Sequence, residues 1–187
     1  MPGLDQSRQF VPLKIAVLTV SDTRSIAEDK SGATLAERIE QAGHAVAARA
    51  IVTDDVEKIR VQARAWIADP AIDVVITTGG TGFTGRDVTP EALEPLFEKR
   101  MDGFSTMLHM VSAPKIGSST IQSRATAGVA NATFIFCLPG SPGACRDAWD
   151  DILVHQLDYR YRPCNFVELM PRLDEHLRRP KSKGATV

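Results

Sequence analysis

Short β-branched runs alternate along this chain with segments in which apolar residues recur at helical spacing. The run Lys14–Val20 is almost continuously apolar, as expected for a strand that is covered on both faces. Leu35, Ile39 and Ala42 then follow at helical spacing, before a second predicted strand at 46–52. This alternation predicts an α/β fold with a mostly parallel central sheet, because parallel strands are joined by crossover helices.

The same alternation continues through the rest of the chain. Apolar spacing predicts a helix at 54–68 and a third buried strand at 73–78. Thr89 and Pro90 are typical of a helix cap followed by its first helical position, and this helix is expected to run through Phe97. We find no internal repeat or interior linker, so we expect a single domain. The remaining predicted elements are a helix at 104–111, a strand pair at 126–131 and 133–138, and a last helix from Ser141.

Composition and charge exclude several classes of function. The 22 basic and 23 acidic residues give a net charge of -1, whereas a general nucleic-acid binder carries a basic excess. No apolar stretch approaches the ~18 residues of a membrane-spanning helix, and the N-terminal residues lack the apolar segment of a secretory signal. The three cysteines show neither disulfide nor metal-ligand spacing, which favours a reducing compartment. We therefore expect a cytoplasmic protein that binds neither nucleic acid nor membrane.

A glycine-rich segment, TTGGTGFTGRD at 77–87, directly follows the third predicted strand. Its four glycines fall within seven positions, which exposes backbone N–H groups and lets the chain approach a phosphate closely. The segment is no P-loop, because it lacks the Gly-Lys-Ser/Thr ending. Gly80, Gly82 and Gly85 match the dinucleotide-binding pattern, although that pattern should follow the first strand and enter a helix directly. A phosphate-binding loop, a mobile turn and a dinucleotide-binding oxidoreductase therefore remain as interpretations.

Two aspartates lie close to predicted strand ends. Asp54 follows the second strand and, with Glu57 three positions on, also fits a helix N-cap with a capping box. Asp87 lies beside the glycines, two positions before the predicted cap at Thr89. Ligands of parallel sheets bind at the carboxyl ends of the strands, so both carboxylates are candidates for one site. Magnesium takes one or two carboxylates together with substrate phosphates, and these two acids could hold it.

Two further segments are expected at the same edge of the sheet. Ser21-Asp22-Thr23 follows the first strand and adds two hydroxyls and a third acid. The run PGSPG at 139–143 follows the last strand and opens a helix, whose N-terminus can seat an anion. Each segment alone fits turn or cap chemistry, and only their joint position favours a ligand site. The histidines share no spacing, and we interpret them as surface or packing residues: His44, His109, His155 and His176.

Five motifs of the chain occur together in one known family. They are SDT at 21–23, DKSG at 29–32, TTGGTG at 77–82, RDVTPEA at 86–92 and LPGSPGA at 138–144. This set resembles the MoaB/Mog family of molybdenum cofactor biosynthesis proteins and is similar to the plant and animal G domains. CNFVELMPRL at 164–173 favours the MoaB branch. We therefore expect an N-terminal extension at 1–12, a molybdopterin-binding domain at 13–173 and a basic, disordered tail at 174–187.

The resemblance implies a three-layer α/β/α fold that binds molybdopterin and forms trimers or hexamers. In active relatives, magnesium-ATP adenylylates the terminal phosphate of the pterin, and the product later accepts molybdate. Acids matching Asp54 and Asp87 are functional in those relatives, which implies catalytic and metal-binding roles here. Other cofactor-biosynthesis proteins are implied as partners. The substrate-binding residues implied on the matching segments are Ser21, Asp22, Thr78, Gly79, Gly80, Thr81, Gly82, Pro139, Gly140 and Ser141.

One segment departs from the MoaB pattern. Relatives read close to PGFGELFR where this chain has DGFSTMLH at 102–109, so Ser105-Thr106 replaces a Gly-Glu pair and His109 replaces an arginine. The following residues, 113–115, also differ from the usual aromatic-acidic run. A molybdopterin-binding or carrier protein without adenylyltransferase activity is therefore the alternative function. The stretch 101–116 has more apolar residues than one helix face requires, which predicts either a subunit contact or packing within the subunit.

Overall fold

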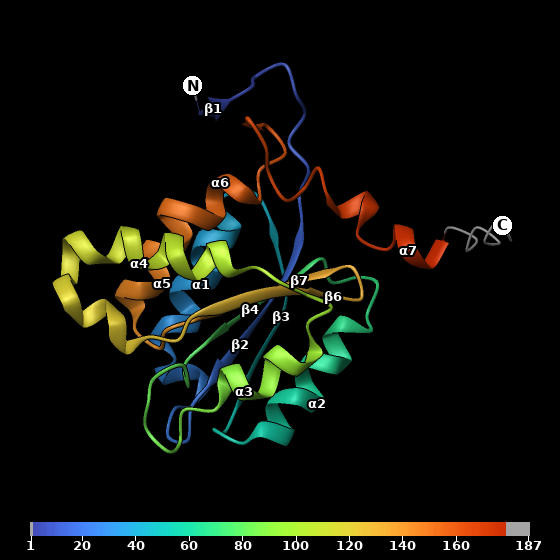
Figure 1. The fold of residues 1–187 in the computed structure, drawn as a ribbon. Coiled ribbons are helices and arrows are strands. Elements are labelled where there is room, and N and C mark those ends of the chain that lie inside the picture. The colour runs from blue at the N-terminus through green and yellow to red at the C-terminus, as the bar shows by residue number, and fades with distance from the viewer. Residues whose placement is uncertain (1, 179–187) are drawn as a thin grey trace, which may run out of the picture.

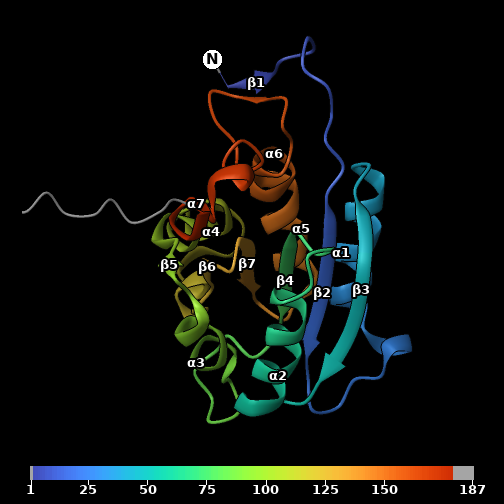
Figure 2. The same ribbon diagram turned by 90° about the vertical axis from the view of Figure 1, so that its right-hand side faces the viewer.

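A six-stranded sheet lies at the centre of the structure, a computed structural model that describes residues 2–178. The strand order is β3-β2-β4-β7-β6-β5, and Figure 2 shows β3 at one edge with β5 and β6 at the other. β3, β2, β4 and β7 run parallel, β6 pairs antiparallel with β7, and β5 pairs antiparallel with β6, so the predicted mostly parallel sheet is confirmed. The strands span Lys14–Val20 (β2), Ala45–Val52 (β3), Val74–Thr78 (β4), Lys99–Arg100 (β5), Thr126–Ala130 (β6) and Thr133–Leu138 (β7).

Seven helices are labelled in the part of the chain that the structure describes. The predicted helix at 89–97 is a short α-helix followed by a 3-10 turn at Glu94–Leu96, where Pro95 has no N–H to donate. The predicted helix at 104–111 extends further at both ends. The helices span Lys30–Gln41 (α1), Val56–Ile67 (α2), Thr89–Leu93 (α3), Asp102–Ile116 (α4), Pro142–Ala148 (α5), Val154–Gln156 (α6) and Glu175–Arg178 (α7).

Alternate residues of the central strands pack into two hydrophobic clusters on opposite faces of the sheet. Ile15 and Val17 of β2 pack in the cluster that includes residues of α1, α4 and α5. Ala16 and Leu18 face the other cluster, with residues of α2 and α3. Side chains alternate between the two faces of a strand, so a continuously apolar strand serves both clusters. Figure 1 shows α1, α4, α5 and α6 on one side and α2 and α3 on the other, which confirms the three-layer α/β/α fold.

The last helical stretch changes its winding along its length. Ser141 caps α5, and its Oγ accepts a hydrogen bond from the Ala144 N–H at 3.1 Å. α5 passes into a π-helical segment at Trp149–Leu153, which continues as α6. Trp149 and Leu153 are both buried there, within the cluster that includes α1 and α4. The predicted helix start at Ser141 is thus confirmed.

The two ends of the described chain lie outside the main sheet. β1 (Gly3–Leu4) pairs with β8 (Tyr161–Arg162) in a small antiparallel sheet, at the top of Figure 1. Arg8 fastens this region by donating from Nη1 to the Tyr159 carbonyl at 2.7 Å. α7 occupies the start of the predicted tail, and residues 179–187 lie outside the described part. Within residues 2–178, no helix combines the length and apolarity needed to cross a bilayer.

The four parallel strands end at one level of the sheet. Val20 of β2 pairs with Val52 of β3, and Thr78 of β4 pairs with both Thr19 of β2 and Leu138 of β7. The loops that follow these strands therefore meet along one edge, at the lower end of the sheet in Figure 1. This is the carboxyl edge at which parallel sheets bind ligands.

Candidate functional site

The glycine loop after β4 starts in a backbone conformation that side chains rarely adopt. Gly79 has a φ of +104° and Gly80 a φ of +63°. A Cβ on Gly79 would collide with the carbonyl oxygen of Val20, and a Cβ on Gly140 would lie 3.1 Å from the Gly79 Cα. The loop therefore packs tightly between the end of β2 and the segment after β7, which explains the glycines at these two positions.

Two side chains approach the loop at Gly80. A Cβ there would collide with the Thr89 hydroxyl and lie 3.0 Å from Oδ1 of Asp54. Thr89 is tied to the loop, because its Oγ1 donates to the Gly79 carbonyl at 2.8 Å and its N–H donates to the Gly80 carbonyl at 2.9 Å. Thr89 is therefore the first residue of α3 and not its N-cap, which is Val88. The predicted cap at Thr89 was wrong because this hydroxyl bonds to the glycine loop.

The structure also corrects the predicted cap of α2. Asp55 and not Asp54 is the N-cap, and its Oδ1 accepts a hydrogen bond from the Lys58 N–H at 2.9 Å. The N–H of Asp54 instead donates to Oδ1 of Asp22 at 3.1 Å, which holds Asp54 in the loop before the helix. Capping therefore does not explain Asp54, whose carboxylate faces Gly80.

The surroundings of Asp54 disfavour its negative charge. Burial raises the pKa of Asp54 above its ordinary value, the nearby charges of Asp22 and Asp87 raise it further, and Arg86 opposes them. A carboxylate that is destabilised by burial and by two other acids gains when a cation binds beside it. A perturbed pKa at the ligand-binding edge of a sheet is typical of functional sites.

Asp87 approaches the loop from its other end. Its Oδ2 accepts hydrogen bonds from the Thr84 N–H at 2.8 Å and the Thr84 Oγ1 at 2.6 Å. These bonds hold the pKa of Asp87 below its ordinary value, so the carboxylate is ionised at neutral pH. A Cβ on Gly82 would lie 2.8 Å from the same Oδ2. Asp54 and Asp87 thus flank the loop at Gly80 and Gly82, which places the two predicted catalytic acids around one segment.

Asp22 links the loop after β2 to the glycine loop. Arg86 donates to its carboxylate from Nε at 2.9 Å and from Nη2 at 2.7 Å, which lowers the pKa of Asp22. Ser21 lies beside it, with its N–H on the Val52 carbonyl at 2.9 Å. The predicted residues Ser21 and Asp22 therefore lie at the site, where Asp22 orients Asp54 and Arg86.

The segment after β7 closes the other side of the site. Thr78 is buried, and its Oγ1 donates to the Pro139 carbonyl at 2.9 Å. The Gly140 carbonyl accepts from Ser31 Oγ at 3.0 Å and from Arg24 Nη1 at 3.3 Å. Several of the predicted substrate-binding residues thus also hold the loops in place. A cavity of about 370 Å³ lies beside them, lined by Thr23, Arg24, Glu28, Lys30 and Pro142.

Magnesium is the metal that this donor set fits. Across residues 2–178, no group of three or more His, Cys, Asp or Glu side chains could form a metal site of protein ligands alone. Magnesium needs only one or two carboxylates, because phosphate and water oxygens complete its shell. Asp54 and Asp87 supply hard oxygen donors beside the glycine loop. These two residues would hold the ion together with a bound nucleotide.

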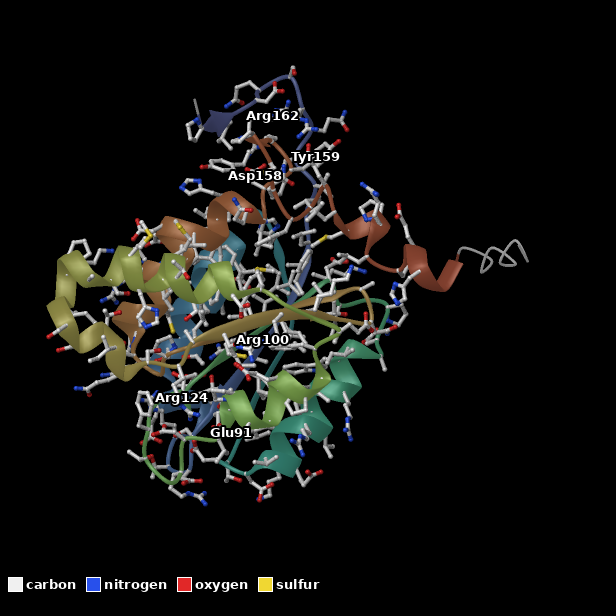
Figure 3. The ribbon with its side chains drawn as sticks, in the orientation of Figure 1. Glu91, Arg100, Arg124, Asp158, Tyr159 and Arg162 are labelled. Atoms are coloured by element: carbon white, nitrogen blue, oxygen red, sulfur yellow. The ribbon has the colours of Figure 1, made fainter. Side chains whose placement is uncertain are left out.

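Sequence reasoning missed two residues that organise the site. Asp29 is 3% exposed and caps α1, and its carboxylate accepts from Gly32 N, Thr19 Oγ1 and Arg49 Nη2. The DKSG motif at 29–32 was the available signal for it. Arg124 lies beside Glu91 near the glycine loop, as Figure 3 shows, and no local pattern marked it.

Comparison with known proteins places the chain in a family. The sequence profile described as "Probable molybdopterin binding domain" matches residues 16–159. Molybdenum cofactor biosynthesis protein B of Escherichia coli (strain K12) is 51% identical over 160 residues, which cover 86% of this chain and 94% of that protein. The protein of the same name from Bacillus subtilis (strain 168) is 42% identical over 163 residues, with 86% and 96% covered.

Solved structures agree with the sequence relatives. A crystal structure of a molybdenum cofactor biosynthesis protein B matches with a TM-score of 0.78 at 40% identity, covering 80% of this chain and 94% of that chain. The tungsten cofactor synthesizing protein MoaB from Pyrococcus furiosus matches with a TM-score of 0.68 at 36% identity, covering 76% and 91%. The chain therefore belongs to the MoaB/Mog family of molybdenum cofactor biosynthesis proteins, within the MoaB branch.

Proposed function

We propose that this protein acts in molybdenum cofactor biosynthesis by binding molybdopterin and transferring an adenylyl group to it from magnesium-ATP. One observation carries the proposal: Asp54 and Asp87 flank a glycine loop at the carboxyl edge of a parallel sheet. The family described as molybdopterin-binding and the relatives named for molybdenum cofactor biosynthesis support the choice of substrate.

In the proposed reaction, an oxygen of the pterin's terminal phosphate attacks the α-phosphorus of ATP. A new phosphorus–oxygen bond forms as the bond to the bridging oxygen of the β-phosphate breaks, and pyrophosphate leaves with the electron pair. Transfer of this kind needs alignment of the reacting groups and neutralisation of charge more than proton transfer. A site built from backbone amides and two carboxylates suits these needs.

In this proposal, backbone amides bind the phosphates and two carboxylates bind the metal. The Gly79 N–H donates to the Leu138 carbonyl at 3.1 Å, so the next two amides, of Gly80 and Thr81, are those proposed to contact phosphate. Asp54 and Asp87 hold magnesium, which supplies charge neutralisation at the phosphate oxygens when bound. Asp22 keeps Asp54 in place through the hydrogen bond from the Asp54 N–H. The absence of bulky side chains at the glycines lets the phosphates approach the backbone.

The alternative function is that of a molybdopterin-binding or carrier protein without adenylyl transfer. The departure from the MoaB pattern at 105–109 favours it. The polar side chains there bond within α4: His109 Nδ1 lies 2.6 Å from the Ser105 carbonyl, and Thr106 Oγ1 donates to the Asp102 carbonyl at 3.4 Å. An assay with ATP, magnesium and molybdopterin, run beside a pterin-binding titration, separates the two functions. Adenylyl transfer yields pyrophosphate and adenylylated pterin. Saturable binding without pyrophosphate would establish the carrier.

We also propose that the protein is a trimer or hexamer with α4 at a subunit contact. Phe104 and Leu108 of this helix are buried, whereas Met107, Met110 and Ile116 are exposed, with Met110 at 62%. One face of α4 thus packs within the subunit, and apolar side chains remain on the other. Sedimentation should give a mass well above the 20.3 kDa of one chain. A monomer at micromolar concentration would exclude the assembly.

A further inference from the structure

We propose that Arg124 is a positioning residue that fixes the loop carrying Asp87, and thereby sets the affinity of the site for its metal. This inference rests on the proposed function, because it takes Asp87 as a ligand of magnesium. Arg124 precedes β6 in the chain and reaches the glycine loop across the edge of the sheet, near Glu91 in Figure 3.

Arg124 bonds to two separate parts of the glycine loop. Its Nε donates to the Gly82 carbonyl at 2.7 Å, and its Nη2 donates to the Asp87 carbonyl at 2.8 Å. Its backbone N–H donates to the Thr81 carbonyl at 2.8 Å. Gly82 lies in the first half of the loop and Asp87 ends it, so one rigid guanidinium fixes the separation of these two residues. Thr84 holds the carboxylate of Asp87, and Arg124 fixes the backbone from which this side chain extends.

Two neighbours hold the guanidinium itself in position. Its Nη1 pairs with the carboxylate of Glu91 in the first turn of α3. This ion pair lowers the pKa of Glu91, so the partner is charged at neutral pH. The ring of Phe83 lies over the other side, with its centroid 5.5 Å from the guanidinium carbon. Arg124 therefore approaches the loop along a direction set by α3 and by the loop's own aromatic side chain.

The middle of the loop depends on few other attachments. Phe83, Thr84 and Arg86 are exposed, and the bonds between Thr84 and Asp87 lie within the loop. The ion pair between Arg86 and Asp22 also connects the loop to the segment after β2. However, 65% of the Arg86 side chain is exposed to solvent, which weakens this ion pair. Loss of the Arg124 bonds should therefore let Asp87 move relative to Asp54.

Lysine cannot replace the arginine in this role. A lysine keeps the positive charge but offers one nitrogen, whereas the acceptors on Gly82, Asp87 and Glu91 are met by three separate nitrogens of Arg124. The substitution Arg124→Lys therefore separates geometry from charge. Residues that orient metal ligands typically change metal affinity by about 10- to 100-fold when they are mutated.

Arg60 of α2 offers a matched control, because it also bonds to α3. Its Nε donates to the Ala92 carbonyl at 3.0 Å, and its Nη2 donates to the Glu91 carbonyl at 2.9 Å. Like Arg124, it bonds to two backbone carbonyls and pairs with one carboxylate, that of Glu57. These partners all lie in α2 and α3 and not in the glycine loop, so Arg60→Lys reproduces the loss of similar bonds without moving Asp87.

The test measures binding of Mn²⁺ in place of Mg²⁺, by electron paramagnetic resonance, with α,β-methylene-ATP bound to the full chain. We expect Arg124→Lys to raise the Kd for Mn²⁺ about 10-fold or more. Asp87→Asn should raise it at least as much, and the double variant should be no worse than Asp87→Asn alone, because Arg124 acts through Asp87. Arg60→Lys should match the parent. The milder variant Glu91→Gln, which leaves the arginine in place, should give a smaller increase.

The outcomes separate this inference from the proposed function. If Arg124→Lys binds Mn²⁺ like the parent while Asp87→Asn does not, the positioning role is wrong and the metal site stands. If Asp87→Asn also binds like the parent, the metal assignment fails and the positioning role fails with it. An equal loss in Arg60→Lys and Arg124→Lys would show a general loosening of α3, which also overturns the inference.

Discussion

Two adjacent aspartates allow helix capping and catalysis to be separated by single substitutions. Asp55 caps α2 through the 2.9 Å bond from the Lys58 N–H. Replacing a capping aspartate by alanine costs about 1 kcal/mol, because a backbone donor in the first turn loses its partner. For a chain of this length, 1 kcal/mol lowers the melting temperature by roughly 2–4 °C. We expect Asp55→Ala to lose about this much stability and to keep its adenylyl transfer activity.

Asp54→Asn should instead keep its stability and lose its activity. Burial and the charges of Asp22 and Asp87 raise the pKa of Asp54 in the folded protein, so the folded state binds its proton more tightly than the unfolded state. Stability therefore falls as the pH rises from the ordinary value of 3.8 through the raised pKa, and this cost is fully present at neutral pH. Asparagine has no charge and removes this cost, so the variant should be at least as stable as the parent. Turnover should fall by about 10² or more with the loss of one preorganised charge.

The assay pairs thermal unfolding at neutral and acidic pH with pyrophosphate release. In the parent, part of the pH dependence of stability should come from Asp54, and this part should vanish in Asp54→Asn. The placement of the cap is tested by Asp54→Ala, because asparagine caps a helix about as well as aspartate. A loss of stability in Asp54→Ala that matches that of Asp55→Ala would contradict it. Parent-level turnover in Asp54→Asn across a magnesium titration would refute its catalytic role.

Three other predictions concern the glycine loop, the second acid and the cysteines. Gly80→Ala should lower the free energy of unfolding in urea by about 2–3 kcal/mol, because Gly80 has a positive φ and a Cβ there would displace the Thr89 hydroxyl from its hydrogen bond. Gly85→Ala, whose Cβ meets nothing within 4 Å, should be neutral, and equal costs in the two variants would contradict this. Asp87→Asn should raise the magnesium concentration for half-maximal turnover, with pterin binding unchanged in a titration; an unchanged requirement would count against the ligand. Burial raises the pKa of Cys137 to about 12 and that of Cys145 to about 11, whereas Cys164 is exposed. Ellman's reagent should therefore label only Cys164 until urea is added, and rapid labelling of a second thiol would contradict this.

The strands were the part of the fold most accessible from the sequence. The predicted bounds of β2 and β7 match the structure, because a buried parallel strand needs a continuous apolar run and this signal is local. β5 was not predicted, since its two residues, Lys99 and Arg100, are polar and exposed and pair with β6 only in the folded chain. The strand predicted at 126–131 ends at Ala130, because Asn131 begins the turn with a φ of +45°.

The site shows where local patterns stop being informative. Asp54 and Asp55 both stand at a position where a helix could begin, and the sequence spacing favoured Asp54. A hydrogen bond to Asp22, 32 residues away, holds Asp54 outside the helix. The hydroxyl of Thr89 is likewise taken by the Gly79 carbonyl. In both cases a contact between strand ends overrides a capping preference, and such contacts follow only from the assembled sheet.

Arg124 illustrates the same limit more strongly. Its acceptors on Gly82 and Asp87 lie 42 and 37 residues earlier in the chain. Arg124 precedes β6 in a polar segment without a recognisable motif, so the sequence does not indicate where its side chain lies. The glycines and acids were recognisable because their chemistry and spacing are distinctive, whereas a positioning arginine is defined only by what surrounds it in space.

The most direct test of the site is a crystal structure of the protein with Mn²⁺ and α,β-methylene-ATP. The proposed function predicts an anomalous peak for the metal about 2.1 Å from one oxygen of Asp54 and one of Asp87, with a phosphate on the amides of Gly80 and Thr81. Metal bound away from both carboxylates, or phosphates bound away from the glycine loop, would contradict it.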